Sequence, residues 1–166
     1  PRYPDLEQYK GKIMDIPYNE GLYVGYRFID KNGIQPNFPF GHGLSYTTFK
    51  YGKPSIDRKK GKADDTFTVT VPVTNTGDRR GKEIVQLYIA DKEASVDRPL
   101  KELKGFSKVE LAPGETKKVS ITFGREALSY FDADRHEWVC EPGEFEAIVG
   151  ASSTDIKGKV TFKITK

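Results

Sequence analysis

Apolar and polar residues alternate in short segments beyond about residue 50 of this 166-residue chain. Every second side chain of residues 66–74 is apolar, and threonine fills much of the opposite face. Residues 83–91 alternate with the same period of two, which is that of a β-strand. We expect the inward face of this second strand to hold Val85, Leu87 and Ile89, and its outward face to hold Ile84, Gln86, Tyr88 and Ala90.

Further short extended segments follow at a spacing of roughly 8–12 residues, which is typical of an all-β domain. They are residues 100–109, 117–123, 130–132, 137–139, 145–149 and 160–164. Turn signals separate them at residues 75–78 and 112–115, and residues 126–128 are compatible with one helical turn. The pattern therefore predicts about seven or eight short strands.

Strands of this number and spacing favour an antiparallel β-sandwich of the immunoglobulin or fibronectin type III kind. The chain has a single cysteine, so the Cys…Trp…Cys pattern of immunoglobulin domains is absent and the fibronectin-like version is favoured. The core is predicted to contain Phe67, Val69, Val71, Val85, Leu87, Ile89, Val119, Ile121, Phe123, Ile148 and Phe162.

The first 49 residues lack a sustained period and contain five prolines and six glycines. Residues 22–28 are the best strand candidate there, and residues 30–33 indicate a turn because Asn-Gly adopts positive φ easily. We expect residues 1–49, called the arm below, to be mostly irregular with little helix. An aromatic segment without a pattern cannot bury its own surface, so the arm should wrap the sandwich or be poorly packed.

Composition suits one soluble, folded domain, with 36% hydrophobic residues, 31% charged residues and a net charge of +3. The basic residues form no long stripe interleaved with aromatics, so nucleic acid is not an expected partner. No run of 18 apolar residues predicts a membrane span, and no signal peptide is visible. The chain begins at Pro1, and we expect its natural N-terminus to lie upstream. The compartment cannot be read from these features.

Three side chains at alternate positions, Asp132, Asp134 and His136, would share one face of a strand and suit a metal ion. The same residues also indicate a hairpin turn in which an aspartate caps its own backbone, and this interpretation is favoured. His42 lies between two glycines and is interpreted as a loop histidine rather than a substrate contact. We expect no metal and no cofactor.

Three single residues allow a chemical and a structural interpretation, and the structural one is favoured for each. Glu20 has no partner carboxylate in a recognisable motif and suits an ion pair or cap. Trp138 could be a platform on which a sugar ring stacks, but packing against Phe145 or Phe131 is favoured. Cys140 follows a strand-like segment and is predicted to be a small buried apolar residue.

Several blocks together resemble one known family. Residues 20–27 (EGLYVGYR) and 38–49 (FPFGHGLSYTTF) are similar to the region joining the α/β sandwich domain to the C-terminal domain of family 3 glycoside hydrolases. Three later blocks fit the fibronectin type III-like domain of the same enzymes: residues 73–77 (VTNTG), 99–106 (PLKELKGF) and 141–153, which contain EPGEF and VGASS. The block order is that of the family.

The resemblance implies a piece of a retaining enzyme of the β-glucosidase or β-xylosidase type, periplasmic or secreted, that acts on β-linked saccharides. In this family the catalytic Asp and Glu lie in upstream domains, and no residue of this chain matches either motif. We therefore expect no catalytic residue and no turnover by the chain alone. Its substrate-binding residues, if any, are not readable from the sequence.

The domain division implied by the resemblance is an arm at residues 1–49 and a fibronectin type III-like domain at residues 50–166. The expected partners are the catalytic domains of the same polypeptide. The expected contact residues are Tyr23, Tyr26, Arg27, Phe38, Phe40, His42 and Tyr46.

Two functions from different classes therefore remain open. One is a non-catalytic domain that braces the catalytic domains of the enzyme. The other is a free-standing β-sandwich module that binds glycan or protein. The aromatic arm favours the first, since a free module has no need of a large exposed apolar surface.

Overall fold

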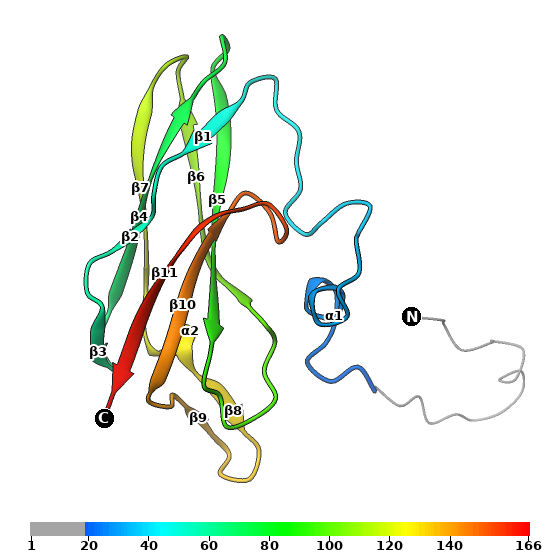
Figure 1. The fold of residues 1–166 in the computed structure, drawn as a ribbon, viewed down its shortest axis with the longest axis vertical. Helices are drawn as coiled ribbons and strands as arrows, with labels where there is room; N and C mark the ends of the chain where they lie inside the picture. The colour runs from blue at the N-terminus through cyan, green and yellow to red at the C-terminus, as the bar shows by residue number, and fades with distance from the viewer. Residues whose placement is uncertain (1–18) are drawn as a thin grey trace, which may run out of the picture.

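The computed structural model describes residues 19–166 and shows a β-sandwich with a helical arm on one side (Figure 1). The helices are α1 (Tyr26–Lys31) and α2 (Arg125–Leu128). The strands are β1 (Phe49–Tyr51), β2 (Ser55–Ile56), β3 (Lys60–Lys62), β4 (Phe67–Asn75), β5 (Gly81–Asp91), β6 (Glu102–Leu111), β7 (Thr116–Phe123), β8 (Tyr130–Asp132), β9 (Glu137–Val139), β10 (Gly143–Gly150) and β11 (Ile156–Thr165).

The strands form two main sheets and a small hairpin. One sheet has the order β3-β11-β10-β5-β6, and in the other β4 pairs with β1, β2 and β7. All pairs are antiparallel except β11 with β3. Strands β8 and β9 form a separate hairpin at the end of the sandwich opposite β1 (Figure 1). The predicted antiparallel sandwich is confirmed, with additional short strands at residues 49–62.

The core lies between the two sheets and has an aromatic centre. Every second residue of β4 is buried, in the order that the alternation predicts. The Phe67 ring packs against Phe123 and Phe162 at centroid distances of 5.7 and 5.0 Å, and Phe162 also stacks on Phe145. Burying one such ring contributes roughly 1.5–3 kcal/mol, so this cluster is a main source of stability.

The prediction of a core position is wrong for one residue. Ile148 is only half-buried, while its neighbours Ala147 and Val149 point into the core. The error is one of register: along β10 the inward positions are the odd-numbered ones, so Ile148 shares the other face with Glu144 and Glu146. The other predicted core residues are buried.

Both faces of β5 are buried in its second half. Val85, Leu87 and Ile89 face the core as predicted, but Gln86 and Tyr88 are also less than 5% exposed. The arm covers this outer face, and it packs there through an aromatic contact. The Tyr26 ring meets the Tyr88 ring edge-on at 5.9 Å.

The strand predicted at residues 22–28 is wrong, because α1 begins there at Tyr26. Gly25 precedes the helix with φ 60°, which breaks an extended path. The helix ends at Lys31; Gly33, two residues further on, also has φ 60°, and the Ile34 amide donates to the Ile29 carbonyl at 3.0 Å. This pairing is a Schellman motif, so the predicted Asn-Gly turn is the C-terminal cap of a helix.

Candidate functional site

One face of α1 binds the arm to β6. The Leu103 amide donates to the Tyr26 hydroxyl at 2.8 Å. Asp30 forms an ion pair with Lys101, and both side chains are more than four-fifths buried. Helical spacing places Tyr26 and Asp30 on the same side of the helix. The described part of the arm therefore wraps the sandwich, the first of the two arrangements predicted for it.

A second contact holds the arm further along the chain. The buried Gln86 amide donates to the Ala151 carbonyl at 2.9 Å, and its carbonyl oxygen accepts from the Tyr88 hydroxyl. Gly41 lies against this amide with φ 82°, and a Cβ there would stand 2.1 Å from the Gln86 nitrogen. Only glycine satisfies both the backbone angle and the close approach. The Ser153 amide also donates to the Phe40 carbonyl at 2.8 Å.

The predicted contact residues fall into two groups. Tyr23, Tyr26 and Arg27 are partly buried and bind the sandwich: the Tyr23 hydroxyl donates to Asp97, and Arg27 pairs with Glu102 at 2.9 Å. Phe40 belongs partly to this group, since its ring stacks on Tyr26 at 5.2 Å while half of its surface stays exposed.

The other predicted contact residues face away from the sandwich. Phe38 is 79% exposed and Tyr46 is 93% exposed, as is their neighbour Leu44 at 94%. His42 is exposed beside the Phe38 ring, at a centroid distance of 5.8 Å. We call these exposed side chains of residues 38–46, which are apolar except for His42, the arm crest.

A groove of about 580 Å³ lies at the end of the sandwich that carries β8 and β9. Its aromatic wall is Phe131 and Trp138, whose rings meet edge-to-face at 5.7 Å. Trp138 is 62% exposed and Phe131 is 50% exposed. The predicted packing of Trp138 on Phe131 is therefore present, but it leaves most of the indole open.

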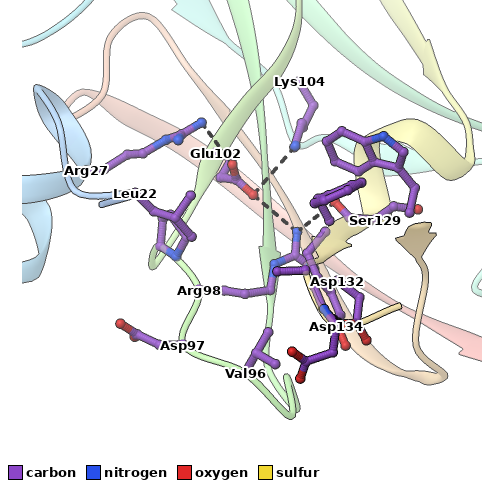
Figure 2. A pocket seen from close by; sticks show the side chains of 15 residues that line it. Leu22, Arg27, Val96, Asp97, Arg98, Glu102, Lys104, Ser129, Asp132 and Asp134 are labelled. Carbon is purple, nitrogen blue, oxygen red and sulfur yellow. Dashed lines mark hydrogen bonds and ion pairs between the residues drawn. The ribbon is translucent and has the colours of Figure 1, made fainter. Parts of the chain in front are cut away.

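The floor of this groove is an ionic network (Figure 2). Glu102 accepts from Arg98 at 3.1 Å and pairs with Arg27 at 2.9 Å and with Lys104 at 3.5 Å. Arg98 also donates to the buried Asp91 carboxylate at 3.0 Å. Burial lowers the pKa of Lys104, and the Glu102 charge offsets part of that shift. No sequence signal predicts this network, because its members come from α1, β5, β6 and the β5–β6 loop.

A second hollow, of about 390 Å³, contains a paired tyrosine and carboxyl group. The Tyr51 hydroxyl donates to Glu83 at 2.7 Å. Burial raises the pKa of Glu83, and the hydrogen bond from Tyr51 offsets part of the rise. Asp155 lies in the same hollow but is bound to Lys157 at 2.8 Å. Both carboxyl groups therefore have structural partners.

The remaining sequence candidates lie outside the two hollows or at their edges, and Asp132 has a structural role. The Asp132 carboxylate accepts from the amides of Asp134 and Arg135 at 3.0 and 3.1 Å, so it caps the hairpin turn. Within residues 19–166 no three His, Cys, Asp or Glu side chains gather in a metal-binding group. Cys140 is partly buried against the core, and burial raises the pKa of its thiol. Glu20 is exposed.

Neither helix within residues 19–166 has the length and apolar character that crossing a membrane requires.

Comparison with known proteins first identifies the class of domain. Residues 83–153 match the family described as fibronectin type III-like domain. The chain is 52% identical over 155 residues to β-glucosidase BoGH3A of Bacteroides ovatus, covering 93% of this chain and 21% of that protein. It is 47% identical to thermostable β-glucosidase B of Acetivibrio thermocellus, covering 97% of this chain and 21% of that protein.

A solved structure agrees with these matches. The GH3 β-glucosidase of Bifidobacterium adolescentis superposes with a TM-score of 0.86 at 37% identity, over 97% of this chain and 23% of that one. The chain thus spans about a fifth of the length of the relatives it matches. The chain belongs to glycoside hydrolase family 3, β-glucosidase type. It is a C-terminal region that contains the fibronectin type III-like domain.

Proposed function

We propose that this chain is a non-catalytic accessory domain that braces the catalytic domains of a retaining β-glucosidase or β-xylosidase. In this proposal residues 1–49 are an arm from the end of the α/β domain, and residues 50–166 are the fibronectin type III-like domain. The partners are the catalytic domains of the same polypeptide, and the saccharide substrate belongs to them.

The arm crest is the observation that carries the proposal. Phe38, Leu44 and Tyr46 are each more than three-quarters exposed, although α1 of the same arm binds the sandwich through Tyr26 and Asp30. An aromatic side chain buries about 150–250 Å² when it is covered, so several exposed apolar side chains in one short segment indicate an interaction surface. The relatives are about five times longer than this chain. The partner in this proposal is therefore the remainder of the same polypeptide.

The chemistry of the chain supports a role without catalysis. Retaining hydrolysis needs two carboxyl groups about 5–5.5 Å apart, one protonated and one ionised. Glu83 is the one carboxyl group of the two hollows whose pKa is raised, and it is bound to Tyr51. Glu102 is held by three cationic groups of the same chain, so it too has structural partners.

The test uses the full-length parent enzyme and a variant with Leu44→Ser and Tyr46→Ser. If the arm crest lies against a catalytic domain, the variant loses several degrees of thermal midpoint, since each buried side chain of this size contributes roughly 1.5–3 kcal/mol. The control is Trp138→Ala, which removes an exposed aromatic of β9 instead of one of the arm crest. An unchanged midpoint in the double variant would contradict the bracing role.

A second assay separates the accessory role from catalysis. The purified 166-residue chain is incubated with aryl β-glucoside and aryl β-xyloside beside the parent enzyme. We expect turnover by the parent alone. Turnover by the chain that disappears on changing one of its own carboxyl groups would overturn the proposal. A gene that does not continue upstream into a barrel domain would favour the free-standing binding module instead.

A further inference from the structure

We propose that the groove between residues 96–104 and the β8–β9 hairpin is a saccharide-binding site, in which Trp138 and Phe131 stack on a sugar ring and Lys104 and Arg27 donate to its hydroxyls. This site goes beyond the bracing role and does not depend on it.

The aromatic wall is the first argument. A pyranose ring presents a face of C–H groups, and exposed aromatic rings bind such faces. Trp138 and Phe131 hold one another edge-to-face at 5.7 Å, which restrains both rings, yet each keeps half or more of its surface open. A hairpin that merely closed one end of the sandwich would bury these rings, as the core buries Phe145 and Phe162.

The hydrogen-bonding groups of the floor are the second argument. An ammonium group has three N–H donors and a guanidinium has five. Lys104 stands 3.5 Å from Glu102, a long contact, and Arg27 reaches Glu102 through one nitrogen while its side chain is 32% exposed. Both groups line the groove and keep donors for a ligand. Asp134, exposed on the hairpin turn, adds an acceptor.

The charge balance of the groove favours a neutral ligand. Its lining contains three basic and four acidic side chains: Arg27, Arg98, Lys104, Asp97, Glu102, Asp132 and Asp134. Most are already paired, so a charged ligand would find little net field. A volume of about 580 Å³ is within the range of small-molecule sites, roughly 300–1,000 Å³. A neutral molecule with an apolar face and many hydroxyls fits best, and that is a saccharide.

Trp138 is the single tryptophan of the chain, so its fluorescence reports this groove directly. The experiment titrates the 166-residue chain with cellotetraose, xylotetraose and laminaritetraose. We expect at least one to change the Trp138 emission in a saturable way, with a Kd near or below about 1 mM. No saturable change with any of the three up to about 20 mM would overturn the proposal.

Two variants and one control assign the binding to named side chains. Lys104→Met keeps the fluorophore and should weaken binding by about fivefold to tenfold. Trp138→Ala should weaken it by tenfold or more, measured by calorimetry. The control Tyr46→Ala removes an exposed aromatic of the arm crest and should change the Kd by less than twofold.

The competing occupant is a protein segment of the parent enzyme, and the same titration distinguishes it. In that case no saccharide would shift the fluorescence of the 166-residue chain. This outcome would refute saccharide binding and leave the bracing role intact. Circular dichroism of each variant confirms that a loss of binding is not a loss of folding.

Discussion

The contact between Gly41 and Gln86 allows a sharp test of how the arm is held. Alanine at Gly41 has two costs. Its φ of 82° lies in the left-handed region, which costs an L-residue roughly 1–2 kcal/mol. The new Cβ would also stand 2.1 Å from the Gln86 nitrogen and displace the amide. A buried amide that loses its hydrogen bonds costs about 1–3 kcal/mol.

The expected loss for Gly41→Ala is therefore about 2–5 kcal/mol, unless the arm detaches first. Detachment would limit the loss to the docking free energy of the arm. The matched control is Gly43→Ala, because Gly43 has no positive φ and a Cβ there meets nothing within 4 Å. The control should stay within about 0.5 kcal/mol of the wild type, as is usual for surface positions.

Two measurements separate these outcomes. Urea unfolding reports the global free energy of unfolding, and amide hydrogen exchange reports local detachment. The Ser153 amide donates to Phe40 and the Leu103 amide to Tyr26, so both should exchange faster in Gly41→Ala. If the Gly41 and Gly43 variants match in stability and in the exchange of these amides, the close approach has no energetic role and the reasoning fails.

Three further perturbations have definite expected outcomes. Leu87→Ala should lower the free energy of unfolding in urea by about 2–5 kcal/mol because Leu87 is fully buried. Ile84→Ala on the same strand should lower it by less than about 1 kcal/mol because Ile84 is 42% exposed. Equal losses would contradict the strand register. Tyr51→Phe should raise the pKa of Glu83 further, measured by carbon NMR, since it removes a bond that lowers it. Folding then favours the protonated form more strongly, so more stability is lost as pH rises from the unfolded-state pKa of Glu83 through its raised folded-state pKa, and an unchanged pKa would refute the coupling. Asp132→Ala should cost about 1 kcal/mol by freeing two turn amides, and Asp132→Asn should recover part of it in thermal unfolding.

Local pattern was sufficient where one face of a strand meets the core. The alternation in residues 66–74 and 117–123 predicts β4 and β7, because a period of two places every second side chain on the buried face. Resemblance of residues 38–49 and the later blocks to family 3 glycoside hydrolases was also readable from sequence. So was the interpretation of Asp132 as a turn residue, since an aspartate binds amides close to it in the chain.

Tertiary structure alone decided what covers the second face of each sheet. Alternation says nothing about an outer face, so the burial of Gln86 and Tyr88 depends on an arm 45 or more residues away in sequence. The same holds for Glu102, whose cationic partners converge from separate elements. The open indole of Trp138 is a third case, because exposure depends on which neighbours are present. Strand faces follow from the stereochemistry of neighbouring residues, whereas clefts and buried polar contacts arise only when distant segments meet.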